Sequence, residues 1–245
     1  MVSEEKIRLN KFLASCGVGS RRSVETLVEE GAVSVDGEVV RFPGTLILPG
    51  QTVSLRGEPL LLQKHLYVVF YKPEGYVCSM SDPHNATIYE MLPISFLNVH
   101  RLFPVGRLDK NSQGLLLLTN DGDFSHSLGH PSQGVSKTYE VMLQRPLMQK
   151  ALFAWREGIP LEGKRRVPLS LEILSREPEN RWIRIVLREG LKREIRLMAE
   201  HLGNRVLFLK RVALGNLELK NLLPGTYRTF SKKELWCMIH HGGSV

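Results

Sequence analysis

Residues 104–123 read PVGRLDKNSQGLLLLTNDGD and contain the strongest structural signal in the chain. Four consecutive leucines, Leu115 to Leu118, predict a buried strand, and the letters NDG that follow predict a turn. Asp109 stands just before that strand, between Arg107 and Lys110. A carboxylate between two cations at the start of a hydrophobic strand fits two interpretations, a surface ion pair or an active site.

Segments on both sides of this stretch predict further strands. LYVVFYKPEG (66–75) is rich in β-forming residues and ends in a turn, because proline lacks an amide donor and glycine accepts a positive φ. SKTYEVML (136–143) and RWIRIVL (181–187) alternate apolar and polar residues, which is the period of a half-buried strand. The strands are mixed with a few helices and show no regular strand–helix–strand rhythm. We therefore expect an α+β domain with a mostly antiparallel or mixed central sheet flanked by helices.

Two helices are expected in the C-terminal part of the chain. The first lies in REGLKREIRLMAEHLGN (188–204), where Lys192 and Arg196, four residues apart, should project from the same side. A Ser-Lys-Lys-Glu capping box at 231–234 opens the second. The first helix has an apolar stripe made of Ile195, Met198, Ala199 and Leu202.

The first 60 residues have an organisation of their own. RLNKFLASCG (8–17) has apolar residues at the spacing of an amphipathic helix, and its glycine is placed to end that helix. Ser20 can cap a second helix, and VSVDGEVV (33–40) is a hairpin signal centred on Asp-Gly. Cations at a helix N-terminus oppose the helix dipole, so basic residues there favour a bound phosphate. Four basic residues lie on the first helix and at the start of the second: Arg8, Lys11, Arg21 and Arg22.

The charge is unevenly distributed along the chain. The 245 residues have a net charge of +8 and a pI of about 9.5. Residues 1–60 hold seven Lys/Arg and eight Asp/Glu, a net of −1, so the other 26 basic and 17 acidic residues give +9. This excess predicts a polyanionic partner, with a merely solvated face as the alternative. We divide the chain into a small N-terminal domain at 1–60, a linker at 61–66 and a larger domain at 67–245.

Composition also excludes several classes of protein. No run of about 18 apolar residues could span a membrane, and the letters MVSEEKIRLNKF lack the apolar core of a secretory signal. Cys16, Cys78 and Cys237 are odd in number and form no CxxC pair, which favours a reducing compartment over a disulfide scaffold or a zinc site. We expect a cytoplasmic protein that is monomeric, because no coiled-coil pattern is present.

Taken in order, the motifs resemble the pseudouridine synthase superfamily. They are K-P-x-G after a strand, G-R-L-D-x-x-S-x-G-L-L-L-L-T-N-D-G, K-x-Y and E-G-x-x-R-E-I-R-x-M. The N-terminal motifs R-L-N-K-F-L-A, G-x-x-S-R-R-S and V-x-V-D-G resemble an S4-type RNA-binding domain over residues 7–55. Together with the R-E-I-R form, they resemble the RsuA/RluB branch, which modifies ribosomal RNA. Each motif alone is weak, but four in register plus the N-terminal domain make an accidental similarity improbable.

The resemblance implies a chemistry for Asp109. In this family the aspartate of the G-R-L-D motif is catalytic, and the reaction detaches uracil from ribose C1′, rotates it and rejoins it through C5. The reaction uses no redox change, metal or other cofactor, and the sequence also lacks metal-ligand and nucleotide-loop motifs. The carboxylate acts either as a nucleophile at C1′ or as a base in a glycal-like elimination, and the sequence leaves both open.

The resemblance also implies roles for other residues. Arg196 would keep Asp109 ionised, because a nearby cation lowers the pKa of a carboxyl group. Tyr139 would stack on the flipped uracil, and Ile195 or Leu197 would pack beneath it. Arg107 would fill the vacated space or hold a phosphate. Loop support is the alternative role for the lysines at 72 and 137. The residues assigned to RNA binding are Arg8, Lys11, Ser20, Arg21, Arg22, Lys72, Arg107, Lys137, Lys192 and Arg193.

Three functions from different classes remain open at this point. The first is an isomerase that acts on ribosomal RNA or a pre-ribosomal particle, with large-subunit RNA favoured over small-subunit RNA. The second is a non-catalytic RNA-binding or ribosome-assembly protein on the same scaffold. The third is a metal-dependent hydrolase that uses Asp109 or Asp121, although the Asp121-Gly122-Asp123 stretch is more typical of a turn.

Overall fold

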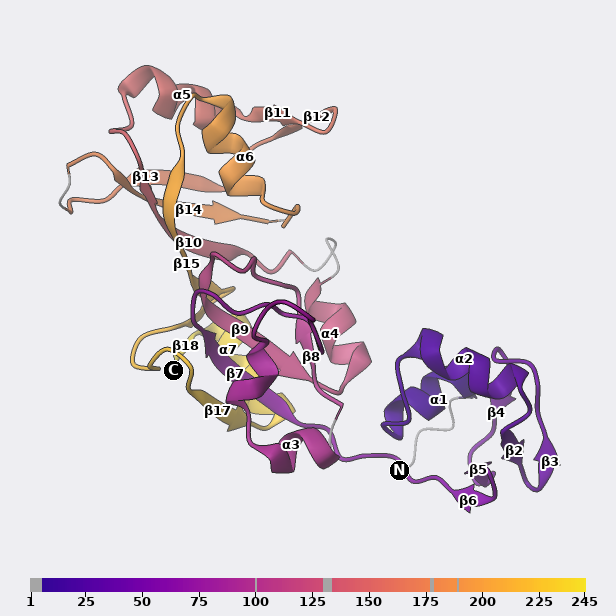
Figure 1. The fold of residues 1–245 in the computed structure, drawn as a ribbon. Coiled ribbons are helices and arrows are strands. Elements are labelled where there is room, and N and C mark those ends of the chain that lie inside the picture. Colours follow the sequence, from indigo (N-terminus) through magenta and orange to yellow (C-terminus); the bar gives the residue numbers. More distant parts are fainter. Residues whose placement is uncertain (1–5, 100, 130–133, 177–178, 189) are drawn as a thin grey trace. The chain divides into compact units, whose positions relative to one another are not determined.

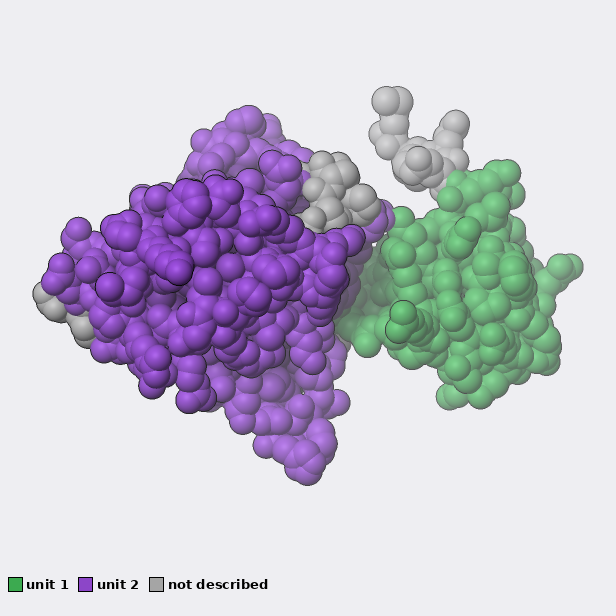
Figure 2. Space-filling model, turned by 90° about the horizontal axis from the view of Figure 1, so that it is seen from above, with its two compact units in different colours: residues 1–65, 93–102 green, residues 66–92, 103–245 purple. Residues whose placement is uncertain are grey.

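The chain contains two compact units. The structure, a computed structural model, describes residues 6–99, 101–129, 134–176, 179–188 and 190–245. One unit comprises residues 1–65 and 93–102, and the other comprises residues 66–92 and 103–245 (Figure 2). None of the helices in these described segments is long and apolar enough to cross a membrane.

The N-terminal unit has three short helices and small sheets. Ser20 caps the second helix, since its hydroxyl accepts the backbone N–H of Ser23 at 3.0 Å. The predicted hairpin turns at Asp36 and Gly37, both at positive φ. These predictions are confirmed, whereas a second hairpin and a strand pair were not foreseen. The elements are β1 (Ile7–Arg8), α1 (Leu9–Ser15), α2 (Arg21–Glu29), β2 (Val33–Val35), β3 (Glu38–Val39), β4 (Leu46–Ile47), β5 (Val53–Leu55), β6 (Glu58–Pro59) and α3 (Ile94–Val99).

The larger unit is built on one mixed sheet. Its strands follow the order β13-β14-β10-β15-β9-β7-β17, with β8 beside β9, and with β16 pairing both β15 and β18. Along that order only β15 and β9 run parallel, and their register joins Arg211 to Gly114. The strands are β7 (Tyr67–Lys72), β8 (Phe103–Val105), β9 (Gln113–Thr119), β10 (Lys137–Leu143), β13 (Ser170–Ile173), β14 (Trp182–Leu187), β15 (Val206–Leu214), β16 (Leu217–Glu218), β17 (Tyr227–Phe230) and β18 (Gly243–Ser244).

Each half of this sheet has its own hydrophobic core. The half with β7 and β9 packs against α4 (Gly122–Gly129) and α7 (Lys232–His241). The half with β10 and β14 packs against α5 (Gln149–Glu157) and α6 (Glu194–His201) (Figure 1). The halves meet at the short parallel pairing of β9 with β15. Smaller elements of this unit are the 3-10 helix η1 (Ile88–Met91), β11 (Ile159–Leu161) and β12 (Lys164–Arg166). The α+β prediction with a mixed central sheet is confirmed.

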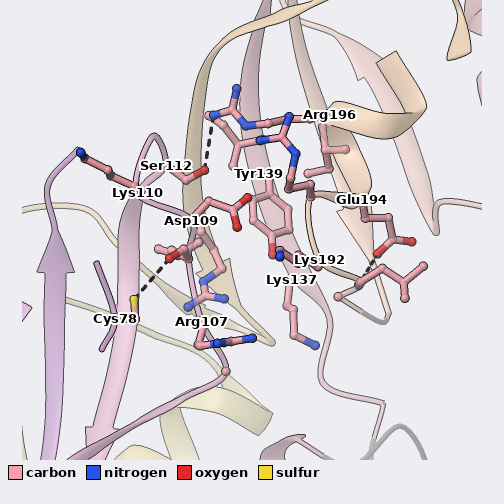
Figure 3. Close-up of a pocket in the computed structure, with 18 of the residues that line it drawn as sticks. Cys78, Arg107, Asp109, Lys110, Ser112, Lys137, Tyr139, Lys192, Glu194 and Arg196 are labelled. Carbon is pink, nitrogen blue, oxygen red and sulfur yellow. Dashed lines mark hydrogen bonds between the residues drawn. The ribbon is translucent and has the colours of Figure 1, made fainter. Parts of the chain in front are cut away.

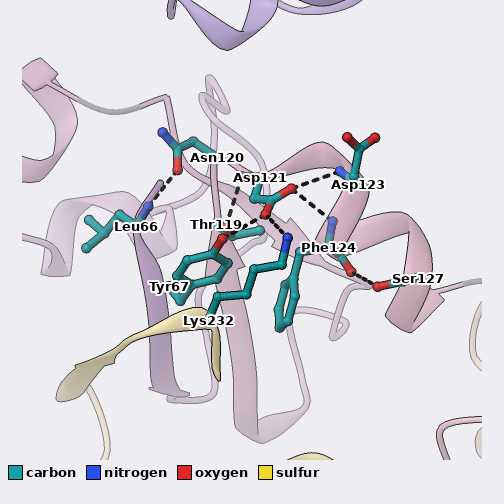
Figure 4. A network of polar contacts seen from close by, with 9 residues as sticks. All are labelled: Leu66, Tyr67, Thr119, Asn120, Asp121, Asp123, Phe124, Ser127 and Lys232. Atoms are coloured by element: carbon teal, nitrogen blue, oxygen red, sulfur yellow. Dashed lines mark hydrogen bonds and ion pairs between the residues drawn. The ribbon is translucent and has the colours of Figure 1, made fainter. Parts of the chain in front are cut away.

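Most local predictions in the larger unit are confirmed, but two are wrong in detail. Leu115 to Leu118 are buried in β9, and Ser231 caps α7 through the predicted capping box. The NDG letters open a helix rather than a simple turn, because Asp121 Oδ1 accepts two N–H groups of the first turn of α4 (Figure 4). Helix α6 begins only at Glu194, since Arg193 has a left-handed φ of 59°, so Lys192 precedes the helix. Glu189, the first letter of the last motif, lies outside the described residues.

Candidate active site

Asp109 lies on the loop between β8 and β9. Gly106 starts this loop at a φ of 70°, and the Asp109 carbonyl accepts the Ser112 N–H at 3.0 Å, which closes a tight turn. Leu108, immediately before the aspartate, is buried and anchors the loop in the core of the α5–α6 half. The Asp109 side chain itself is half-buried. The sequence prediction of a carboxylate on a loop at the start of β9 is confirmed.

Lys72, the last residue of β7, supports this loop through hydrogen bonds to backbone carbonyls. Its ammonium group is fully buried and donates to three backbone carbonyls, at 2.9 Å to Pro73, 3.3 Å to Lys110 and 2.7 Å to Ser112. Three donors meet three acceptors, so this ammonium group is saturated inside the protein. The assignment of Lys72 to RNA binding is therefore wrong, and the alternative role in loop support holds. Burial lowers the pKa of Lys72 to about 8.

Asp109 faces a cleft of about 660 Å³ between the two halves of the sheet. One wall is the β8–β9 loop, and the other comes from β10, β15 and the segment from Gly190 to Arg196. Figure 3 shows the Asp109 carboxylate pointing toward the ring of Tyr139. The fold therefore brings Asp109 together with Tyr139, 30 positions later in the sequence, and with Arg196, 87 positions later. Apolar lining is supplied by Val77, Leu187, Leu191, Ile195 and Leu209.

Tyr139 is a buried residue in the lining of the cleft. It stands on β10 opposite Ile185 of β14 and Arg211 of β15, and only 7% of it is exposed. Burial raises the pKa of its hydroxyl, and the Arg211 guanidinium beside it opposes that rise. Tyr139 is therefore a neutral, buried aromatic side chain in the lining of a cleft that also holds a carboxylate.

Arg196 reaches from the first turn of α6 to the loop that carries Asp109. Its Nη2 donates to the Asn111 carbonyl and, at 3.5 Å, to the Ser112 hydroxyl. Burial lowers the pKa of Arg196, and the charge of Asp109 opposes this shift. Within the described segments no direct ion pair joins Asp109 and Arg196. Arg196 thus fixes the loop and supplies positive potential to the cleft without touching the carboxylate.

The structure separates the remaining predicted residues into those in the cleft and those outside it. Arg107, Lys137, Lys192, Arg193 and Ile195 line the cleft. Lys137 Nζ donates to the carbonyls of Val135 and Arg188, both at 3.3 Å, so it also supports the wall. Leu197 is absent from the lining, because it lies on another side of α6 from Ile195. Of the two residues expected beneath the uracil, only Ile195 is placed for contact.

The five predicted RNA-binding residues of the N-terminal unit are on or beside its helices. Arg8 precedes α1 and is exposed, and Lys11 is half-buried on that helix. Arg21 and Arg22 are exposed in the first turn of α2. The Ser20 hydroxyl is occupied by the cap of α2, so its role there is structural.

Sequence reasoning missed Arg211, which lines the cleft and is 1% exposed. Its Nε donates to the Leu115 carbonyl at 2.7 Å across the junction between β15 and β9. A signal was present in VLFLKRVAL, because Leu209, Arg211 and Ala213 share one face of a strand and that face is buried. A cation at an inward position of a regular strand indicates a structural or functional need for charge.

The metal-hydrolase alternative needs clustered ligands. The parts of the chain that the structure describes contain no group of three or more His, Cys, Asp or Glu side chains that could hold a metal ion. Asp121, one of the two carboxylates in that alternative, is 2% exposed, caps α4 and lies 2.9 Å from Lys232 Nζ. Its oxygen atoms are therefore engaged in the fold.

Two family models and several relatives match this chain. The family model described as RNA pseudouridylate synthase matches residues 66–201, and that of the S4 domain matches residues 7–53. An uncharacterized RNA pseudouridine synthase of Bacillus subtilis (strain 168), YtzG, is 35% identical over 232 residues, which cover 94% of this chain and 97% of the relative. The ribosomal large subunit pseudouridine synthase B of the same organism is 33% identical over 241 residues, covering 96% and 98%.

A solved structure supports the same relationship. A crystal structure of a pseudouridylate synthase matches with a TM-score of 0.67 and 31% identity, covering 94% of this chain and 98% of that chain. The family matches extend over both units of the chain, and the cleft lies in the larger one. The chain belongs to the RNA pseudouridine synthase family, in the RsuA/RluB-like branch with an N-terminal S4 domain, and is a pseudouridine synthase.

Proposed function

We propose that this enzyme isomerises a uridine of ribosomal RNA, with large-subunit RNA as the target and Asp109 as the catalytic residue. The relative named ribosomal large subunit pseudouridine synthase B aligns over nearly the whole of both chains, which supports this target. The basic excess of residues 61–245 suits a polyanionic substrate. The S4 match over residues 7–53 provides a second RNA-binding unit.

One observation carries the catalytic proposal. Asp109, Tyr139 and Arg196 come from three separate elements and line the same cleft of about 660 Å³. Pockets that enclose small ligands measure roughly 300–1,000 Å³, so a single nucleotide fits this volume. A non-catalytic RNA binder has no use for a carboxylate at the centre of a cationic cleft, because a carboxylate repels phosphate.

Substrate binding begins with extrusion of the target uridine from its stack. Extrusion costs a few kcal/mol and is easiest for a base that is already unpaired. The ring of Tyr139 offers a fixed surface for the uracil, and base–aromatic stacking contributes about 1–3 kcal/mol. Ile195 provides apolar contact, while Arg107 and Lys192, at the exposed rim, attract backbone phosphates.

The chemical step requires an ionised carboxylate beside the sugar. Asp109 attacks C1′ or removes the proton bonded to C2′. In either case the C1′–N1 bond breaks and its electron pair leaves on the uracil. The uracil turns within the cleft and C5 bonds to C1′, which releases Asp109 from C1′ or is followed by return of the proton to C2′. The C5 proton departs to solvent and N1 takes up a proton. The guanidinium of Arg196 lines the same cleft as Asp109 and holds the loop through the Asn111 carbonyl.

Tritium release tests this assignment directly. RNA carrying tritium at uridine C5 is incubated with the enzyme and a chelator, and label is counted in the solvent. Release should persist with the chelator and disappear in Asp109→Asn, while Asp123→Asn, which removes an exposed carboxylate outside the cleft, should match the wild type. Activity that persists in Asp109→Asn would disprove the catalytic role of this residue.

A second experiment identifies the target. Pseudouridines are mapped in ribosomal RNA from cells with and without the gene. We expect one large-subunit position to lose its modification and to regain it when the wild-type gene, but not the Asp109→Asn gene, is restored. Loss of a small-subunit position instead would move the target while leaving the chemistry unchanged.

A further inference from the structure

Arg211 is the most deeply buried cation of the cleft and has an unused donor. It is 1% exposed, and its Nε donates to the Leu115 carbonyl at 2.7 Å. Its Nη2 is buried and has no hydrogen-bond partner. A buried charged donor without a partner has lost its hydration with nothing in return, so a retained one implies a partner that is supplied at some stage.

The surroundings of Arg211 restrict the nature of that partner. The residue pairs in register with Tyr139 on β10, and its guanidinium lies against the Tyr139 hydroxyl. Arg211 and Tyr139 line one cleft with Asp109, and the apolar side chains of Leu187 and Leu209 complete this part of the lining. A guanidinium in such an apolar recess interacts strongly with negative charge, because little water screens it. A ligand stacked on Tyr139 would bring its edge to this recess.

The chemistry of the proposed reaction creates such a charge. When the C1′–N1 bond breaks, its electron pair passes to the uracil, where it is delocalised over N1 and the two carbonyl oxygens. The neutral uridine has no comparable charge before the bond breaks. A hydrogen bond from a donor to a uracil oxygen therefore becomes stronger as the C1′–N1 bond breaks. An interaction that is stronger in the transition state than in the ground state lowers the barrier.

We propose that Arg211 is a further catalytic residue, which donates through Nη2 to a carbonyl oxygen of the departing uracil and stabilises its negative charge. This proposal rests on the proposed function, in which the base is stacked on Tyr139 while Asp109 acts at the sugar. Asp109 starts the cleavage of the C1′–N1 bond, and Arg211 stabilises the anion produced. The anion is consumed when C5 bonds to C1′, which displaces the Asp109 carboxylate if it had bonded to C1′, or is followed by return of the proton to C2′ if Asp109 had removed it. N1 then takes up a proton as the C5 proton leaves, so atoms and electrons balance.

Arg211→Gln and Arg211→Lys test the proposal with two substrates. Single-turnover rates are measured on the target RNA with uridine and with 5-fluorouridine at the reactive position, as loss of the N-glycosidic nucleoside after nuclease digestion. Removal of one donor to a developing oxyanion lowers a rate by about 10²–10³-fold. We expect the single-turnover rate of Arg211→Gln to fall by this factor with uridine and by a smaller factor with 5-fluorouridine, because fluorine already stabilises the uracil anion. Arg211→Lys, which keeps the charge, should retain part of the rate.

A matched control separates chemistry from folding. Arg156 also donates from its guanidinium to a backbone carbonyl, that of Leu171 at 3.0 and 2.7 Å, but lies outside the cleft. Arg156→Gln should leave both rates unchanged. An equal loss of rate with the two substrates in Arg211→Gln would overturn the proposal and indicate a role in positioning. Complete loss in Asp109→Asn with wild-type rates in Arg211→Gln would refute the role of Arg211 while preserving that of Asp109.

A binding measurement covers the case in which Arg211→Gln folds poorly. Free 5-nitrouracil is an anion at neutral pH, whereas uracil is neutral and similar in shape. Calorimetry on the folded wild-type enzyme and on folded Arg211→Lys measures the affinity for each base. The wild type should bind the 5-nitrouracil anion more tightly than uracil. Equal affinity of the wild type for both bases, or tighter binding of uracil, would contradict the proposal without reference to any rate.

Discussion

At the scale of single residues, the position of Asp109 is set by cations that do not touch its carboxylate. Lys72 holds the loop by donating to the carbonyls of Lys110 and Ser112, and Arg196 holds it by donating to the carbonyl of Asn111. Both use backbone acceptors, so they hold the loop without occupying the Asp109 carboxylate.

Lys72 gives the enzyme an expected loss of activity in mild alkali. Its pKa is lowered to about 8 by burial, and the neutral amine has two donors for three carbonyls. We expect the rate to fall as pH rises through about 8. Between pH 8 and the usual value of 10.5 the unfolded chain holds this proton and the folded one does not, so the Lys72 contribution to the free energy of unfolding rises with pH.

The measurement compares activity and stability over the same pH range. Tritium release and urea midpoints are recorded between pH 7 and 10 for the wild type and for Lys72→Met. The wild-type rate should fall without loss of stability, and the variant, already slow, should lack the transition near pH 8. A fall in activity that tracks unfolding, or one that is identical in Lys72→Met, would contradict this account.

Asp121 has a structural role that its neighbours define. It is 2% exposed and accepts from Tyr67 Oη at 2.7 Å, from Lys232 Nζ at 2.9 Å and from the first turn of α4 (Figure 4). We expect Asp121→Ala to lower the free energy of unfolding by about 3 kcal/mol, because it removes a helix cap and a buried acceptor together. Lys232→Ala should cost about 1 kcal/mol or less, since that side chain is 55% exposed.

Tryptophan fluorescence during urea denaturation measures these changes. All three tryptophans, Trp155, Trp182 and Trp236, lie in the larger unit, so the signal reports that unit alone. Asp123→Ala is the control, because this exposed neighbour should change stability by about 0.5 kcal/mol or less. Equal effects of Asp121→Ala and Asp123→Ala would show that burial of the first carboxylate is irrelevant.

At the scale of elements, the decisive contact is the parallel pairing of β9 with β15. It joins two halves that each have their own core, and the Asp109 loop belongs to one half while Tyr139 belongs to the other. Only two residue pairs form this junction, Lys210 with Gln113 and Arg211 with Gly114. Small changes here should therefore alter the distance between Asp109 and Tyr139.

Gly114 permits that junction. Its φ is +111°, and a Cβ atom there would lie 2.2 Å from the Arg211 carbonyl oxygen and 2.7 Å from the Arg211 nitrogen. These are backbone atoms, so relief requires the strands to separate. We expect Gly114→Ala to lower the free energy of unfolding by about 3 kcal/mol and to reduce tritium release strongly.

Gly129→Ala is the matched control for this substitution. Gly129 ends α4, has no atom within 4 Å of an added Cβ and does not have a positive φ. It should leave urea midpoints and rates near the wild-type values. A harmless Gly114→Ala would show that the two halves of the sheet can adjust independently.

At the scale of the whole molecule, charge is sorted within the N-terminal unit rather than accumulated there. Residues 1–60 have a net charge of −1, yet Arg21 and Arg22 are exposed in the first turn of α2 while acidic residues follow later on that helix. The N–H groups and dipole of a helix N-terminus favour an anion, and the two arginines increase that preference. The larger unit carries the net positive charge and the cleft.

Salt dependence tests this N-terminal surface. Arg21→Ala and Arg22→Ala should weaken RNA binding, and each lost phosphate contact should reduce the slope of log affinity against log salt by about one. Arg56→Asn is the control, because Arg56 is also exposed in this unit but lies in the β5–β6 turn at a positive φ that asparagine accepts. Unchanged slopes in both arginine variants, or an equal change in Arg56→Asn, would exclude a specific phosphate site on α2.

Local patterns in the sequence predict most of the main helices and strands and most of the candidate site residues. Burial of β9 follows from four consecutive leucines, and the caps at Ser20 and Ser231 follow from local patterns, because period and capping depend on neighbours within about four residues. The order of the motifs along the chain marks Asp109, Tyr139 and Arg196 as candidate site residues.

The three-dimensional packing, and not the local sequence, determines which cations line the cleft and which support the fold. Lys72 meets the carbonyl of Ser112, and Arg211 meets the carbonyl of Leu115, across 40 and 96 positions of sequence. Strand order and a parallel junction bring these groups together, and no local pattern encodes such pairings. The physical reason is that a buried charge is defined by partners distant in the chain, whereas a helix or strand is defined by its own periodicity.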